Sequence, residues 1–114
     1  MAKASLSKSG LPGEVAVAVR QLGEHLRTAR IRRHESQAHF ARRLLVATST
    51  LQRMEAGDPG ISIATWASAL WALGMLPQFR RLAHPDEDTL GKALEIRRLP
   101  KSVRMAKGRA HDEF

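Results

Sequence analysis

The sequence predicts an all-α protein: one small helical domain followed by a basic C-terminal extension. Three observations support this fold class. Hydrophobic residues make up 43% of the 114 residues, which is enough for a packed core. Apolar residues recur at helical spacing from residue 15 to residue 83, and strand-like alternation of β-branched residues is scarce.

The first predicted helix begins after Pro12-Gly13, with Glu14 near the positive end of its dipole. An apolar stripe follows at steps of four and three, formed by Val15, Val19, Leu22, Leu26 and Ala29. Arginines fill the last turns, where cations are favourable: Arg27, Arg30, Arg32 and Arg33.

Two short helices are expected next, separated by a tight turn. Ser36 is the expected N-cap of the first. The third predicted helix ends at Gly57, and a loop over residues 58–60 follows. The side chains expected to pack between the two helices are Phe40, Ala41, Leu44, Leu51 and Met54.

A fourth helix is predicted between Ser62 as N-cap and Gly74. Its expected inner stripe is Ile63, Trp66, Ala67, Leu70 and Leu73. A fifth, very short helix follows Pro77, with Phe79, Leu82 and Ala83 inward, and stops at His84-Pro85. Residues 86–99 form a weaker helical pattern in which Asp88 is the expected cap and Gly91 lowers stability.

Several classes of function are excluded by composition. The chain has no cysteine, which removes disulfides, thiolate catalysis and cysteine-based zinc sites. Its five histidines lack the spacing of a metal site, and no catalytic constellation or Gly-rich phosphate loop occurs. We therefore expect no enzyme activity, metal or cofactor. We find no membrane span or signal peptide, and we expect a cytoplasmic protein.

The positive charge points to a polyanionic partner. The formal net charge is +8, and two segments carry most of it. Residues 20–53 contain eight arginines and two glutamates, and residues 97–109 contain six basic residues and no acid. Charge alone would fit DNA, RNA or an anionic membrane surface. The scarcity of aromatic residues for base stacking disfavours RNA, and the lack of a bulky apolar face disfavours lipid.

Residues 36–57 carry the most specific pattern, two short helices joined by a tight turn. Together with the flanking helices, this stretch resembles the five-helix DNA-binding domain of Xre/Cro-type regulators over about residues 20–76. The matching positions are Leu22, Gly23, Arg27, Arg30, Ser36, Gln37, Phe40, Ala41, Val46, Thr50, Leu51, Arg53, Glu55, Gly57 and Ile63. On this basis residues 1–12 are an expected flexible N-terminus, 13–84 the DNA-binding domain and 85–114 a partly disordered extension.

Two positions depart from the family pattern. The turn between the second and third helices has Leu45 where the family has glycine in a left-handed conformation. The expected cap of the third helix is Ala47 instead of serine or threonine, and Thr48 is the alternative cap. Capping by Thr48 would move the start of the recognition helix by one residue.

The resemblance implies roles for individual side chains. Gln37 would bond a DNA phosphate. Thr48, Ser49 and Arg53 would face base edges, Arg53 as a bidentate partner of guanine. Thr50 and Gln52 are secondary candidates for base or phosphate contacts, and Arg42 and Arg43 would lie near the DNA backbone. Glu55 would have a structural role, paired with Arg30.

The same resemblance implies a homodimeric transcriptional repressor that binds a palindromic operator in double-stranded DNA. Residues 61–75 and the C-terminal extension resemble HipB-like antitoxins, which would add autoregulation of the operon and a HipA-like kinase toxin as partner. The alternative is a stand-alone Xre-family or phage-type regulator without a toxin. Candidate dimer contacts are Trp71, Leu76, Phe79, Leu82, Leu90, Leu94 and Ile96.

Overall fold

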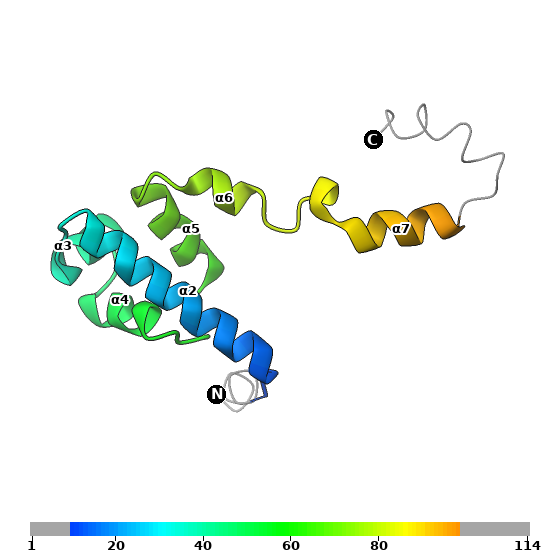
Figure 1. Ribbon diagram of the computed structural model, residues 1–114. Coiled ribbons are helices and arrows are strands. Elements are labelled where there is room, and N and C mark those ends of the chain that lie inside the picture. The colour runs from blue at the N-terminus through cyan, green and yellow to red at the C-terminus, as the bar shows by residue number, and fades with distance from the viewer. Residues whose placement is uncertain (1–9, 99–114) are drawn as a thin grey trace. The chain divides into compact units, whose positions relative to one another are not determined.

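The computed structural model describes residues 10–98, and all regular elements in that range are helical (Figure 1). They are α2 (Gly13–Arg32), α3 (Gln37–Arg43), α4 (Thr48–Glu55), α5 (Ile63–Ala72), α6 (Leu76–Arg80), the short 3₁₀ helix η1 (Pro85–Glu87) and α7 (Thr89–Arg98). The predicted all-α class is confirmed. The chain divides into two compact units, one up to Phe79 and one from Arg80 onward.

Residues 1–9 and 99–114 lie outside the described part of the chain. The expected flexible N-terminus therefore falls almost wholly outside it. The same holds for most of the basic segment 97–109, of which only Arg97 and Arg98 are described.

Helix α2 begins where the sequence predicts, after Pro12 and with Glu14 in its first turn. Its buried face is different from the predicted stripe. Gly23, Leu26 and Arg30 are buried, whereas Val15 and Leu22 are 42% and 41% exposed. Helical periodicity identifies an apolar stripe, but the position of the neighbouring helices decides which part of it is covered.

The core of the first unit is built from residues of α2, α3, α4 and α5, and α4 packs against both α2 and α3. Phe40, Leu51 and Met54 are completely buried. The other buried members of the cluster are Leu26, Ala41, Leu44, Ala69 and Leu73. The predicted packing of the two short helices is confirmed. Ser36 caps α3 by accepting a hydrogen bond from the His39 backbone N–H at 3.1 Å, as predicted.

Gly23 marks the closest approach of two helices. A Cβ built at this position would lie 2.6 Å from the Met54 carbonyl oxygen and 2.8 Å from that of Glu55. Only glycine allows α2 to approach the end of α4 this closely. Ala41, the small residue that the sequence predicts at a crossing, is also buried.

Helix α5 starts after Ser62, whose hydroxyl accepts from the Thr65 backbone N–H, and Gly74 follows its C-cap, as predicted. The predicted stripe is wrong at its first residue, because Ile63 is 69% exposed at the helix start, whereas Ala69 is fully buried. Trp66 packs against the core.

The prediction for the segment after Gly74 is partly wrong. Helix α6 ends at Arg80, and Leu82 and Ala83 are exposed rather than inward. Ala83 has a left-handed φ of 54°, which a continuing helix does not allow. Phe79 is half-buried.

Helix α7 lies within the predicted range and has the predicted cap. The Asp88 carboxylate accepts from the Gly91 backbone N–H at 2.8 Å. A Cβ at Gly91 would lie 1.9 Å from the same carboxylate, so the residue that weakens the helix also makes room for its cap.

Candidate nucleic-acid interface

The turn between α3 and α4 has a left-handed residue where the resemblance predicts one, although that residue is leucine and not glycine. Leu45 takes a left-handed φ of 57°, and its side chain is 93% exposed. Ala47 is the N-cap of α4 without a side-chain cap, and Thr48 is the first helical residue. The alternative start, one residue later, is therefore not adopted.

Helix α4 has one buried face and one exposed face. Leu51, Met54 and Glu55 point into the domain, and Figure 1 shows α4 lying along α2. The exposed residues include most of the predicted contacts, Thr48, Ser49, Gln52 and Arg53, whereas Thr50 is half-buried. A helix of this kind presents a short polar surface on a rigid support.

Arg53 is held by an ion pair at the end of α4. Its Nε donates to the Asp58 carboxylate at 2.7 Å, and the same carboxylate accepts from the Gly60 backbone N–H at 2.7 Å. The side chain of Arg53 remains half exposed. Asp58 thus orients the guanidinium through Nε, whereas a bidentate contact with guanine would use the two Nη groups.

A buried ion pair joins α2 to α4. Arg30 donates from Nε to Glu55 at 2.6 Å and from Nη2 to the other carboxylate oxygen at 3.0 Å. Its Nη1 donates to the Glu35 carbonyl at 2.8 Å, at the entrance to α3. The predicted pairing of Glu55 with Arg30 is confirmed, and it ties α2, α4 and the loop before α3 together.

The hydrogen bond from Arg30 to Glu55 raises the pKa of this guanidinium above its ordinary value, and the charge of Glu55 raises it further. Burial lowers the pKa, but its effect is smaller than that of the hydrogen bond. Arg30 therefore carries a permanent positive charge, which is neutralised inside the protein.

The ion pair continues to the surface through two glutamines. Gln37 Nε2 donates to Glu55 at 3.1 Å, and the side-chain Oε1 of Gln37 accepts from Gln52 Nε2 at 3.4 Å. The side chain of Gln37 is thus held between the buried carboxylate and the exposed face of α4. Gln37, the first residue of α3, is therefore linked to Gln52 on α4.

Arg42 and Arg43, predicted together, differ in their surroundings. Arg43 forms an ion pair with Glu35, donates to the Ala72 carbonyl at 2.8 Å and stacks over Phe40 at 5.8 Å. Arg42 is exposed, and within residues 10–98 its side chain has no hydrogen bond or ion pair. Arg43 therefore supports the scaffold, and Arg42 is available to a ligand.

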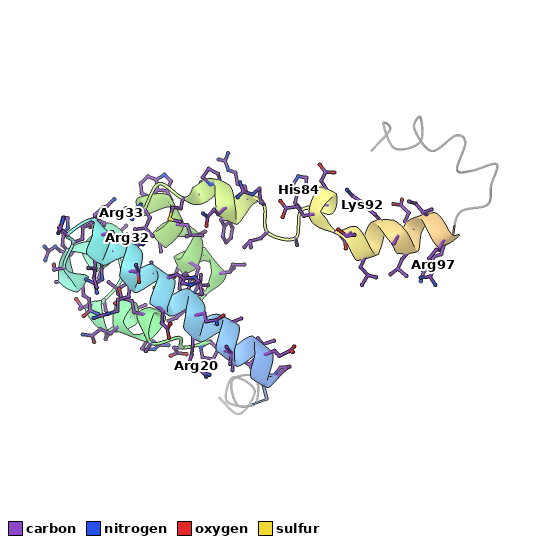
Figure 2. All side chains as sticks on the ribbon, in the orientation of Figure 1. Arg20, Arg32, Arg33, His84, Lys92 and Arg97 are labelled. Atoms are coloured by element: carbon purple, nitrogen blue, oxygen red, sulfur yellow. The ribbon has the colours of Figure 1, made fainter. Side chains whose placement is uncertain are left out.

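Arg32 and Arg33 lie close together near the end of α2 (Figure 2), but their contacts differ in the same way. Arg33 donates to the carbonyls of Ala29 and Leu73, at 2.8 and 2.9 Å. Arg32, beside it, is exposed, as are Arg20 and Arg27. Sequence reasoning missed the structural roles of Arg33 and Arg43, because the carbonyls of Leu73 and Ala72 that they bond are 40 and 29 residues away in the sequence.

Gly23 is a third residue whose role the sequence analysis did not identify, although it lies among the matching positions. A glycine within a long helix costs about 1 kcal/mol relative to alanine, and this cost was the available signal for a close packing contact.

Other kinds of site find no support in the described residues. No group of three or more histidine, aspartate or glutamate side chains there could hold a metal ion. In the same part of the chain, no helix combines the length and the apolar character that crossing a bilayer needs.

Comparison with known families places this part of the chain in a known domain family. The model of a helix-turn-helix domain matches residues 21–83, more than half of the chain. Neither the curated proteins nor the solved structures give a match. The matched range contains α3, the turn with Leu45, and α4, together with the helices that support them. The chain therefore belongs to the helix-turn-helix domain family, of the Xre/Cro-like type, whose fold is that of DNA-binding regulators.

Proposed function

We propose that this protein is a sequence-specific transcriptional repressor that binds double-stranded DNA through α4. The observation that carries the proposal is the exposed face of α4, with Ser49, Gln52 and Arg53 on a helix fixed by buried residues. A rigid polar helix that carries Arg53, with the exposed Arg42 on the preceding helix, suits the major groove. In this proposal residues 13–84 form the DNA-binding domain and residues 85–114 an extension.

Thr48, Ser49 and Arg53 are the proposed base-reading residues, with Thr50 and Gln52 in support. They occupy the first turns and the outer face of α4, where a recognition helix meets base edges. The pair with Asp58 favours a fixed orientation of Arg53, which lowers the entropy lost when it binds a base.

Phosphate contacts are proposed for Gln37 and Arg42. Gln37 Nε2 carries a second N–H besides the one that faces Glu55, and Arg42 is exposed without a protein partner among the described residues. For Arg43 a phosphate contact would require release from Glu35 and from the Ala72 carbonyl, so we assign it to the scaffold.

Selection from a randomised library of DNA duplexes tests the base-reading role. Arg53→Ala should retain its fold, by circular dichroism, and lose about 1–3 kcal/mol of discrimination at one base-pair position. Unchanged discrimination would exclude Arg53 as a base-reading residue.

Arg42→Ala is the matched control, since it removes the same charge from the neighbouring helix. It should weaken binding to all sequences alike and lower the salt slope by about one unit. A change of base preference in this variant would contradict its assignment to the DNA backbone.

Dimeric binding to a palindromic operator and a HipB-like antitoxin role also belong to this proposal. Both rest on the sequence resemblance, with a HipA-like kinase as the expected partner. Purification of the tagged protein together with the product of the neighbouring reading frame tests the antitoxin role. If the protein binds its operator but no kinase-like protein is purified with it, the result favours the stand-alone regulator.

A further inference from the structure

The first unit contains an apolar pocket that the proposed DNA contacts do not use. Its volume is about 550 Å³, which lies within the range of small-molecule sites in proteins. The residues that line it belong to α2, α5, α6 and the turns that follow α2 and α5, and all of them precede Phe79. The apolar part of the lining consists mainly of Leu22, Leu26, Ala29, Trp66, Leu70 and Leu73.

This pocket combines a rigid base with uncovered apolar surface. Leu26 and Leu73 belong to the buried core, so part of the lining is the core itself. Leu22 is 41% exposed, and Trp66 and Leu70 are half-buried. A ligand with an apolar body would remove this surface from water, which favours binding.

The charged part of the lining is basic. Arg32, Arg33 and His25 contribute to it, Thr28 and Gln78 are uncharged, and none of the described lining residues is acidic. An apolar pocket with basic groups and no carboxylate favours a ligand that joins an apolar body to an anionic group.

Two backbone carbonyls fix the guanidinium of Arg33. Its Nη1 donates to the Ala29 carbonyl at 2.8 Å and its Nη2 to the Leu73 carbonyl at 2.9 Å, so this side chain joins the end of α2 to the C-cap of α5. A guanidinium has five N–H groups, and three therefore remain for a ligand. Because the side chain is already ordered, less conformational entropy is lost when it binds an anion.

Arg32 is the second arginine of the pocket, and it has no internal partner. It is exposed, and within residues 10–98 its side chain forms no hydrogen bond or ion pair. Figure 2 shows it close to Arg33 at the end of α2. A planar guanidinium pairs with a carboxylate through two parallel N–H···O bonds, so Arg32 is available for such a pair.

From these features we infer that the pocket binds a small monocarboxylic acid with an apolar body, of the class of medium-chain fatty acids. The carboxylate pairs with Arg32 and Arg33, and the apolar chain lies against Trp66 and Leu70. This site goes beyond the proposed function, because the pocket is formed without α4 and its ligand is not DNA.

Decanoate, below the concentration at which it forms micelles, is the probe, and tryptophan fluorescence of the full chain is the readout. The chain has two tryptophans, and Trp71 is 65% exposed and lies outside the pocket lining. In the Trp71→Phe variant, the emission of Trp66 should change saturably as decanoate is added. Decyltrimethylammonium has the same chain with a cationic head, and acetate has the carboxylate without the chain. Neither should change the emission.

Arg32→Gln, made in the Trp71→Phe background, tests the carboxylate contact. It should raise the Kd for decanoate on the order of tenfold. Arg27→Gln is the matched control, because it removes the same charge from an exposed arginine of α2 outside the pocket lining. It should bind decanoate as the parent does. Equal weakening in the two variants would mean that decanoate responds only to the net charge of the protein, and would overturn the inference.

Leu22→Glu tests the pocket itself, since it places a carboxylate in the lining at an exposed position. It should abolish decanoate binding while circular dichroism shows the helices intact. Decanoate should also raise the midpoint of thermal unfolding of the parent but not of this variant.

Three results would overturn the inference: no saturable change of Trp66 emission, an equal response to decyltrimethylammonium, or a folded Leu22→Glu variant that binds decanoate normally. If decanoate does not bind and Leu22→Glu instead prevents association with another protein chain, the pocket is a protein contact and the inference is rejected. All of these measurements are made without DNA, so failure of the proposed function would not affect their outcome.

Discussion

The helix-turn-helix over residues 36–57 and the C-terminal segment over residues 80–98 differ in what stabilises them. In the first, local capping coincides with burial: Ser36 caps α3, and Phe40 and Leu51 are fully buried. In the second, Asp88 caps α7, but Leu82 and Leu90 are 62% and 70% exposed. Caps determine where a helix begins, whereas burial determines how it packs.

The ion pair of Arg30 with Glu55 gives the largest expected effect in this comparison. Glu55→Ala leaves a buried guanidinium without its carboxylate, and we expect a loss of about 3–5 kcal/mol in the free energy of unfolding. Urea denaturation followed by circular dichroism measures it. The raised pKa of Arg30 keeps its guanidinium charged at every pH below the ordinary pKa of arginine. Raising the pH toward that value should therefore not cause the loss of stability expected for Glu55→Ala.

Glu87→Ala is the matched control in the C-terminal segment. Its pair with Arg81 is 3.8 Å long, and both side chains are about 60% exposed, so the loss should stay within about 1 kcal/mol. Equal losses in the two variants would remove the distinction between the two regions.

Asp88 caps the N-terminal end of α7. Asp88→Ala removes the cap of this helix and should cost it about 1 kcal/mol, since few tertiary contacts compensate. Amide hydrogen exchange over residues 89–98 should become faster, while exchange in α3 and α4 stays unchanged. Faster exchange in α4 as well would mean that the two units unfold together.

The sequence predicts most helix limits correctly because they depend on local chemistry. Ser36, Ser62 and Asp88 cap the helices that they were expected to cap, and Gly57 and Gly74 follow helix ends. The errors lie in burial, where Val15, Leu22, Ile63 and Leu82 are exposed. These side chains depend on which helix lies opposite them, which periodicity alone does not specify.

In the candidate site, too, some features were predictable from the sequence and others were not. The pairing of Glu55 with Arg30 was predictable because the family pattern fixes both positions. The different roles of Arg42 and Arg43 were not predictable. They depend on the bonds of Arg43 to Glu35 and to the carbonyl of Ala72, which is 29 residues away in sequence. The sequence shows which residues are basic, but only the fold shows which of them already have an acidic or carbonyl partner.

The smallest expected effect comes from the turn inside the well-packed region. Leu45 has a φ of 57°, which costs a residue with a Cβ about 1–2 kcal/mol, and its exposed side chain contributes little burial in return. Leu45→Gly relieves this strain but increases the entropy of the unfolded chain, so the expected net gain is below about 1 kcal/mol.

Leu45→Ala distinguishes strain from the exposed side chain, because alanine keeps the Cβ and removes the isobutyl group. If strain is the cause, thermal denaturation should give a higher midpoint for the glycine variant than for the alanine variant. If both variants match the wild type in stability but bind DNA less well, Leu45 is retained for its exposed side chain. Position 45 would then belong to the DNA-binding surface rather than to the turn alone.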